Sequence, residues 1–547
     1  MRKKYFFTLG PVLLFTFSLT SWAWAKKFPL TAAEASHFTA TSTYQEVKEF
    51  INQLQEQTAL LRVKTLAVSS EGRAVPLLII GQPPPSHPSV LRYDHRVPVY
   101  IQANIHAGEV EGKEASLMLA RNILQEDSPY LEKLVILIAP IFNPDGNEKI
   151  DPSHRQNQAG PDKGVGIRYN GQNLDLNRDS MKLESPEMRG LVQNVLTYWD
   201  PVLLVDCHTT NGSFHQEPVT YSWPLNPNGN LSIIQYMRQK MLPSVSKILK
   251  QKYNTLSIPY GNFMDFKNPE KGWRTFSHLP RFLTNYMGLR SRLAILDENY
   301  AYADYKTRVY ACYHFLLAIL DYCSEHSVEI SDLVARADQK TTTAGSQPSE
   351  KDGFAVEFDL QPVDEKVTIQ GWEMEVLPGE EGWPRVKKTD RKRVFILPYF
   401  SDFIPRRTVP FPHAYLIPVQ DSDLISKLCQ HGLMVERLTQ PVNLEVESFL
   451  IQEIKASERL YQGHHLNSIK GEYFSEKKNF PAGSYVISTA QPLGNLAVYL
   501  LEPESDDGLL VWNFFDRYVS PQWGRRPQVY PVYRLRKPAN LAKEGIQ

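Results

Sequence analysis

The stretch Val99-Tyr-Ile-Gln-Ala-Asn-Ile-His106-Ala-Gly-Glu109 places an apolar segment directly before a histidine and a carboxylate. Its first half is rich in β-forming residues and predicts a buried strand that stops near His106. Ala107 and Gly108 let the backbone turn, so that the side chains of His106 and Glu109 can face one point. Zinc takes nitrogen and oxygen ligands of these types at about 2.0–2.2 Å. A single His-x-x-Glu is common by chance, so this pair needs support from the rest of the chain.

Three further apolar runs each end in a polar cluster. They are residues 135–138 before Asn143-Pro-Asp-Gly146, residues 201–205 before Asp206-Cys207-His208, and residues 292–296 before Asp297-Glu298. In open α/β sheets, sites form in the crevice beyond the carboxyl ends of the strands. Several strands that deliver His, Glu, His and Glu to one edge therefore predict a metal site.

The alternation of strand, helix and strand over residues 97–140 indicates the fold class. It predicts an α/β fold with a mixed, largely parallel central sheet covered by helices. Strands are also expected at 61–67 and 75–80, and helices at 43–54, 112–124, 230–250 and 302–323. We expect the domain that carries the site to span residues 26–335.

A second domain is expected after a linker. Residues 336–352 have almost no apolar content and are predicted to be that linker. Residues 353–547 are predicted to form a smaller β-rich domain, because strand-like segments recur there. Those segments are 354–360, 366–376, 393–397, 414–419 and 484–489, with helices expected near 424–435 and 445–454.

The first 25 residues have the three parts of a secretory signal peptide. Arg2-Lys-Lys4 is positively charged, residues 5–22 are apolar, and Ala23-Trp-Ala25 fits a cleavage site of small residues. An uncleaved anchor is the competing interpretation, because the apolar part approaches the length that spans a bilayer. No second long apolar segment follows in the sequence. The mature protein is therefore predicted to be exported, periplasmic or extracellular, without stable membrane insertion.

Composition and cysteine content narrow the partners further. The 547 residues carry a formal net charge of zero, so nucleic acid is not an expected partner. Four cysteines in a chain of this length do not make a disulfide framework. Cys312 and Cys323 fall three turns apart on one predicted helix, too far to bond each other. Cys207 is expected to point into the core.

Residues 147–180 form a long polar stretch with little periodicity, and such a loop is uncommon without a function. Within it, Asp175 and Asn177 alternate with leucines, which places both on one side of an extended segment. With Arg178 alongside, this group can hold a carboxylate through charge-assisted hydrogen bonds.

Five segments of the chain occur in the order and rough spacing of a known family. They are His106-Ala-Gly-Glu109, Asn143-Pro-Asp-Gly146, Asp175-Leu-Asn-Arg178, Asp206-Cys-His208-Thr-Thr and Leu293-Ala-Ile-Leu-Asp-Glu298-Asn-Tyr. These segments resemble the zinc carboxypeptidase family, the metallocarboxypeptidases, over about residues 40–325. The C-terminal half of the chain resembles the β-rich tail of some exported bacterial members.

The resemblance implies a metal site. His106, Glu109 and His208 would hold one zinc ion per chain, and Asp175 would orient His106. We prefer His208 to its rival His215, because His208 directly ends an apolar strand. Two further acidic rivals of Glu109 are expected on the exposed side of the following helix, namely Glu111 and Glu114.

The resemblance also implies how a substrate is held and cut. Asn177 and Arg178 would bind the terminal carboxylate of a peptide, and Glu298 would act as general base and then as general acid. The family's electrophilic arginine has no unambiguous counterpart: Arg155 fits by position, and Arg168 is its rival.

The chain departs from the family pattern at two places. Gly108 stands where the digestive members carry an arginine that helps to bind substrate, so an extended peptide would be held differently. The family's mobile tyrosine has only two candidates, Tyr286 and Tyr300.

Three ligands on zinc leave a position for water, as in catalytic sites. The leading hypothesis is an exported metallocarboxypeptidase that hydrolyses the C-terminal amide bond of peptides with a free carboxylate. The alternative is a zinc-dependent deacylase or amidase that acts on an acylated amino acid or a cell-wall peptide. A third hypothesis, from another class, is an inactive binding module.

Overall fold

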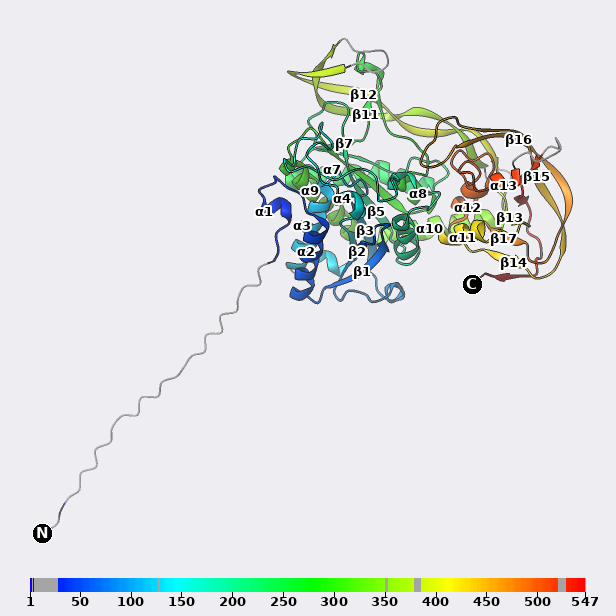
Figure 1. The fold of residues 1–547 in the computed structure, drawn as a ribbon, viewed down its shortest axis with the longest axis horizontal. Coiled ribbons are helices and arrows are strands. Elements are labelled where there is room, and N and C mark those ends of the chain that lie inside the picture. The colour runs from blue at the N-terminus through cyan, green and yellow to red at the C-terminus, as the bar shows by residue number, and fades with distance from the viewer. Residues whose placement is uncertain are drawn as a thin grey trace.

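The computed structural model describes residues 1, 3, 28–125, 128–349, 353–377, 385–519 and 528–546. The predicted signal peptide therefore lies almost entirely outside the described residues. The chain forms an N-terminal lobe and a C-terminal lobe, which β11 and β12 connect along one side (Figure 1). Within the described residues, no helix combines the length and apolar character that crossing a membrane requires.

An eight-stranded mixed sheet forms the centre of the N-terminal lobe, in the order β1-β2-β4-β3-β5-β10-β6-β7. Its four central strands β4, β3, β5 and β10 run parallel. At one side β1 and β2 pair antiparallel with their neighbours, and at the other β6 pairs antiparallel with β10 and parallel with β7. The strands are β1 (Leu61–Val68), β2 (Ala74–Ile80), β3 (Val97–Ala103), β4 (Leu134–Ala139), β5 (Leu203–Thr210), β6 (Val219–Ser222), β7 (Ser257–Pro259) and β10 (Leu293–Tyr300). The predicted fold class is confirmed.

Helices such as α2, α3, α7 and α9 cover the sheet and pack apolar residues into a common core with it. Thr43 and Glu46 form a capping box that begins α2, and the buried face of this helix has the spacing expected from the sequence. The helices are α1 (Ala32–Ala35), α2 (Tyr44–Gln57), α3 (Glu111–Gln125), α4 (Pro144–Asn147), α5 (Pro186–Leu191), α6 (Leu231–Tyr236), α7 (Leu242–Tyr253), α8 (Leu283–Leu289), α9 (Tyr305–Glu325) and α10 (Ser327–Ser346).

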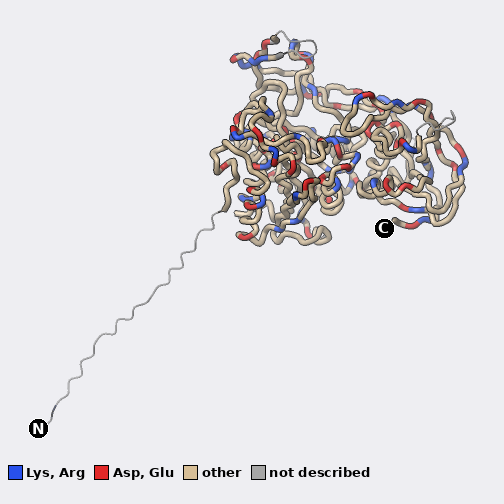
Figure 2. Tube along the Cα trace, viewed as in Figure 1, with Lys and Arg blue, Asp and Glu red and all other residues tan. Residues whose placement is uncertain are grey.

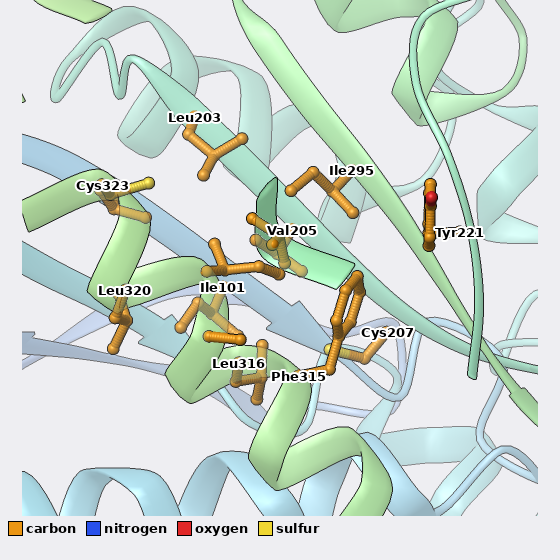
Figure 3. Close-up of a cluster of buried hydrophobic side chains, with 14 of the residues drawn as sticks. Ile101, Leu203, Val205, Cys207, Tyr221, Ile295, Phe315, Leu316, Leu320 and Cys323 are labelled. Atoms are coloured by element: carbon orange, nitrogen blue, oxygen red, sulfur yellow. The ribbon is translucent and has the colours of Figure 1, made fainter. Parts of the chain in front are cut away.

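The core between α9 and the central strands is close-packed and apolar. Phe315 and Leu316 of α9 pack near Ile101 of β3 and Val205 of β5 (Figure 3). Cys207 belongs to the same cluster and is 1% exposed, so it points into the core as predicted. This packing fixes the positions at which the parallel strands end.

Two further sheets make up the rest of the molecule. A four-stranded sheet in the order β11-β12-β9-β8 contains β8 (Asn262–Phe263), β9 (Trp273–Arg274), β11 (Gly353–Leu377) and β12 (Arg385–Pro410). The C-terminal sheet contains β13 (Ala414–Ile417), β14 (Glu436–Leu438), β15 (Val442–Ala456), β16 (Asn467–Phe480), β17 (Tyr485–Ser488), β18 (Gln528–Val529), β19 (Tyr533–Leu535) and β20 (Lys543–Gly545). It is accompanied by α11 (Ser422–Gln430), α12 (Gly494–Leu501) and α13 (Asp516–Val519).

The predicted linker at 336–352 is wrong over most of its length, because α10 continues to Ser346. The helix buries small residues, Ala337, Thr341 and Gly345, along one face. A Cβ atom on Gly345 would lie 2.2 Å from the backbone carbon of Thr489, so the helix packs directly against the C-terminal lobe. Small residues carry little hydrophobic signal, which is why the sequence suggested a linker.

The helix expected near 445–454 is also wrong, because these residues lie in β15. That strand pairs antiparallel with β16 along most of its length. Its burial alternates at Leu444, Val446 and Ser448, which is the period of a strand with one solvated face.

The lobes are not separated at residue 352. Ile369 of β11 and Phe395 of β12 belong to the apolar core of the N-terminal lobe. In the opposite direction, Leu283 of α8 shares one core with residues of the C-terminal lobe such as Tyr415 and Tyr499. Basic and acidic residues are interspersed over both lobes (Figure 2), in accord with the zero formal net charge.

Candidate metal centre

The parallel strands bring the predicted metal ligands to one edge of the sheet. His106 and Glu109 lie in the turn between β3 and α3, and His208 lies near the end of β5. Glu298 on β10 is the direct register partner of His208. Site formation beyond the carboxyl ends of parallel strands is the expected location in an α/β sheet.

Three donor atoms converge in a buried cluster. Nδ1 of His106 lies 3.2 Å from Nδ1 of His208 and 3.1 Å from Oε1 of Glu109. Nδ1 of His208 lies 2.9 Å from Oε2 of Glu109. A tetrahedral zinc ion with ligands at about 2.0–2.2 Å would separate them by about 3.3–3.6 Å. The donor set therefore fits zinc with small side-chain adjustments.

Each histidine contacts a carboxylate through its other ring nitrogen. Nε2 of His106 lies 3.0 Å from Oδ1 of Asp175, and Nε2 of His208 lies 2.8 Å from Oδ2 of Asp206. A carboxylate in this position accepts a hydrogen bond from the protonated Nε2, which leaves Nδ1 unprotonated and free to bind metal. A role for Asp206 was not predicted. The available signal was its position two residues before His208 on the same face of the strand.

The pKa values of two carboxyl groups at the cluster shift in opposite directions, that of Asp175 downward and that of Glu298 upward. Burial raises the pKa of Asp175, but the charge of His106 and of nearby arginines outweighs this, and the pKa lies below its ordinary range. Burial raises the pKa of Glu298; the charge of His208 opposes this effect and the carboxylate of Glu109 adds to it.

Both candidate arginines lie close to the predicted metal ligands. Nη1 of Arg155 lies 3.0 Å from Oε1 of Glu109, and its Nη2 donates to the carbonyl oxygen of Thr209. Nη1 of Arg168 lies 3.6 Å from the same Glu109 oxygen, and its Nε donates to Asp175. Both side chains line the cavity described below, so the two alternatives stay open.

A cavity of about 640 Å³ opens beside the predicted metal ligands. Its lining includes His106, Glu109, Arg155, Gln158, Arg168, Asn177, Arg178, His208, Thr209, Tyr260, Asn262, Phe276, Phe282, Thr284, Leu296 and Glu298. The geometry thus brings all the predicted site residues to one place, with Asp175 behind His106.

The predicted carboxylate-binding pair is held by its neighbours. The guanidinium carbon of Arg178 lies 4.1 Å from the centre of the Phe282 ring, and Nη1 of Arg178 donates to the carbonyl oxygen of Asn177. The backbone amide of Leu283 donates to Oδ1 of Asn177 over 2.9 Å. The amide nitrogen of the Asn177 side chain lies 3.4 Å from Nε2 of His208, and Asn177 lines the cavity.

Gly108 owes its lack of a side chain to Arg155. A Cβ atom at Gly108 would lie 2.6 Å from Cδ of Arg155 and 2.8 Å from the carbonyl oxygen of Gly166. The stem of Arg155 thus occupies the space next to residue 108. This gives a physical reason for the departure from the family pattern at that position.

Neither candidate tyrosine lines the cavity. The hydroxyl of Tyr286 is fully buried 2.8 Å from Nδ1 of His431, and the hydroxyl of Tyr300 accepts from the backbone of His215. The cavity is instead lined by Tyr260, which follows β7 in a loop. Nothing in the sequence around Tyr260 distinguished it.

The rival ligands have other partners. His215 packs on Tyr300 with ring centres 4.0 Å apart. Glu111 pairs with Arg308, and Glu114 accepts a hydrogen bond from the backbone of Ser42. The expectation that these two glutamates are exposed is wrong: both are fully buried, because α3 is covered on all sides.

The comparisons with known proteins agree with this geometry. Residues 47–255 match the family model described as zinc carboxypeptidase. Carboxypeptidase 2 of Trichophyton equinum is 22% identical over 489 residues, which cover 86% of this chain and 81% of that protein. Carboxypeptidase 2 of Trichophyton rubrum is 21% identical over 491 residues, with the same coverage of 86% and 81%.

Similar solved structures include a metallo-carboxypeptidase from Burkholderia cenocepacia, with 16% identity, a TM-score of 0.37 and coverage of 51% of this chain and 69% of that one. Carboxypeptidase A from Helicoverpa armigera has 16% identity, a TM-score of 0.37 and coverage of 53% and 75%. Residues 47–255 of this chain are thus similar to the zinc carboxypeptidase family.

Proposed function

We propose that the protein is an exported, zinc-dependent metallocarboxypeptidase that removes the C-terminal residue of peptides. The observation that carries this proposal is the single cavity lined by three converging zinc donors, by Glu298 and by the pair Asn177 and Arg178. Hydrolysis of the last peptide bond needs a bound metal, a base and a group that binds the terminal carboxylate, all within the length of one residue.

The residues divide the reaction between them. Zinc held by His106, Glu109 and His208 would act as a Lewis acid and would lower the pKa of a bound water molecule toward about 7. Glu298 accepts the proton of the attacking water and delivers it to the leaving nitrogen. Arg155 or Arg168 donates hydrogen bonds to the oxygen on which negative charge develops.

The carboxylate-binding pair selects the end of the peptide. Arg178 carries a permanent charge and forms two parallel hydrogen bonds with a carboxylate when the geometry allows. Asn177 adds a neutral donor. A substrate whose C-terminus is an amide lacks the charge that Arg178 recognises, so we expect it to be cut poorly.

The test is product analysis by mass spectrometry. Zinc-loaded protein is incubated with a mixed peptide library, with the same peptides amidated at the C-terminus, and with N-acyl amino acids. Loss of single C-terminal residues from the free acids is the expected result. Release of acyl groups with the peptides left intact would support the deacylase alternative, and no product from any substrate would contradict both.

The exported location rests on the sequence of residues 1–25. If these residues are a cleaved signal peptide, N-terminal sequencing of protein collected outside the cytoplasm should start at residue 26. Full-length protein that stays in the membrane fraction would support the uncleaved anchor.

A further inference from the structure

A buried ion pair joins the C-terminal lobe to the loop before α8. Asp507 is fully buried, and its carboxylate accepts hydrogen bonds from the backbone amide of Arg281 over 2.7 Å and from Nε of Arg281 over 3.0 Å. Nη2 of Arg281 lies 2.7 Å from the same carboxylate. The indole of Trp512 donates to Asp507 over 2.8 Å, and the Arg281 guanidinium lies over that ring at 4.8 Å. Arg281 is thus fixed through both its backbone and its side chain.

The two residues that follow Arg281 are those that hold the carboxylate-binding pair. Phe282 supplies the ring beneath the guanidinium of Arg178, and Leu283 supplies the amide bonded to Asn177. Because these residues are consecutive, a shift of the backbone at Arg281 would move both contacts together. The position of the pair therefore depends on an anchor that lies in the other lobe.

A second contact holds the pair from its other side. Oε1 of Gln462, in the C-terminal lobe, accepts a hydrogen bond of 2.8 Å from the backbone amide of Asp175. Gln462 has a φ of 51°, a left-handed conformation that non-glycine residues rarely adopt. The neighbouring Tyr461 lies against Arg281, whose guanidinium is 5.2 Å from its ring centre. The same loop thus touches both segments that build the carboxylate-binding pair.

We propose that Asp507 and Gln462 of the C-terminal lobe are positioning residues that set the geometry of Asn177 and Arg178 for a substrate carboxylate. This inference rests on the proposed function, since it assumes that these two side chains bind the C-terminus of a peptide. It assigns the C-terminal lobe a role in recognition: the lobe completes the substrate site from behind without lining it.

The physical reason for such an arrangement is preorganisation. A flexible arginine loses side-chain entropy when it binds a carboxylate, and fixing it beforehand lowers that cost. Hydrogen bonds to a buried carboxylate do not exchange with water, so the Arg281 anchor holds the loop more firmly than a surface contact would. A misplacement of about 1 Å in a binding group can reduce the rate of an enzyme by about 10²-fold.

The test is the kinetics of Asp507→Asn, which keeps the shape of the side chain and removes its charge. We expect KM for free-acid peptides to rise about tenfold while kcat and the zinc content stay near wild type, because an interaction made equally in the ground and transition states affects KM alone. The weak cleavage of amidated peptides should not change. If the substitution lowered only the stability of the protein, KM for free-acid peptides would not rise relative to the cleavage of amidated peptides.

Asp506→Asn is the matched control. Asp506 is the neighbouring carboxylate and also contacts the N-terminal lobe, through Nε2 of His278 at 2.8 Å, but it does not touch Arg281. This variant should keep the wild-type KM. A rise in KM equal to that of Asp507→Asn would show a general effect of weakened contact between the lobes and would overturn the proposal.

Gln462→Ala decides the case if Asp507→Asn fails to fold. Gln462 lies in a partly exposed loop, and its removal leaves the ion pair intact. A raised KM for free acids with unchanged zinc content would support the inference, and a wild-type KM would overturn it. If wild-type protein cleaves no peptide at all, the proposed function has failed; if it cleaves and both variants match it, only the inference has failed.

Discussion

At the scale of single residues, the site consists of ligands and of the groups that orient them. His106 and His208 each present Nδ1 to the cluster because a carboxylate occupies Nε2. The orientation of a ring thus depends on Asp175 in one case and on Asp206 in the other. Changes at these orienting groups and at the proposed base should have separable effects.

Glu298→Gln should remove the base and leave the metal ligands in place. We expect kcat to fall by about 10²–10⁴-fold, the range that general-base catalysis typically contributes. Zinc content, measured by elemental analysis of the purified variant, should equal that of wild type. Turnover that survives the substitution would refute the assigned base.

Asp206→Asn should weaken metal binding. The amide offers a donor as well as an acceptor to Nε2 of His208, so the tautomer that leaves Nδ1 free is no longer favoured. Zinc affinity is expected to fall about 10–100-fold, as measured by competition with a chromogenic chelator. An affinity equal to wild type would contradict the orienting role of Asp206.

His106, Glu109 and His208 could be picked out from the sequence because they lie at or just after the ends of apolar strands. Asp206 was within reach of the same reasoning, since it alternates with His208 on one strand. Tyr260 was not, because it lies in a loop whose path depends on packing between β7 and β9. Glu111 and Glu114 misled for a related reason: burial of a helix on all sides depends on elements far away in sequence.

At the scale of elements, α5 carries a buried acid with a pH-dependent cost. Glu187 is fully buried near the start of this helix, and burial raises its pKa to about 7 from the ordinary 4.5. Nδ2 of Asn170 donates to one carboxylate oxygen over 3.2 Å. Among the described residues, the other oxygen has no hydrogen-bond partner.

Glu187→Gln should therefore change how stability depends on pH. A raised folded-state pKa gives a contribution to stability that is present below pH 4.5 and is lost as the pH rises through about 7. In wild type this loss amounts to at most about 3 kcal/mol in the free energy of unfolding. The stability difference between variant and wild type, measured by urea unfolding at pH 5 and pH 8, should move in favour of the variant at pH 8. An equal difference at both pH values would contradict this assignment.

Gly345→Ala separates helix propensity from packing in α10. Propensity alone predicts a gain of about 1 kcal/mol, since alanine is the better helix former. The added methyl group would collide with the backbone of Thr489, so we expect a net loss of about 1–3 kcal/mol. Thermal unfolding measures the difference, and Thr343→Ala on the exposed side of the helix is the control expected to be neutral or slightly stabilising.

Elements with regular apolar spacing could be predicted from sequence, as α2, α3 and the strands of the central sheet show. The errors at α10 and β15 share one physical origin. In the second half of α10 the buried residues are the small Ala337, Thr341 and Gly345. In β15 the apolar residues at 446, 449, 450 and 454 recur at the spacing of a helix, although the segment is a strand. Both elements owe their conformation to partners far away in sequence.

At the scale of the whole molecule, the two lobes share a buried apolar cluster. Their apolar cores are continuous: Leu283 of α8 and Tyr499 of α12 belong to the same buried cluster. The expectation of two domains joined by a linker is replaced by a shared core. If one lobe unfolded alone, apolar residues of the other lobe that belong to this shared core would become exposed to water.

Calorimetry should therefore show a single cooperative transition for the zinc-free protein. The calorimetric and van't Hoff enthalpies are expected to agree, because neither lobe retains its core alone. Tryptophan fluorescence and far-ultraviolet circular dichroism should report the same midpoint. Two resolved transitions would show that the lobes fold independently despite the common cluster.

The fit between Arg155 and the bare position 108 has an evolutionary consequence. A chain that acquired a long basic side chain at 108 would first have to vacate the space that the Arg155 stem fills, and would also have to move the carbonyl of Gly166. Either substitution made first passes through an intermediate that is crowded or that has lost a cation beside Glu109. A basic residue at 108 and the present arrangement with Arg155 are thus two separate solutions, and exchange between them requires paired mutations.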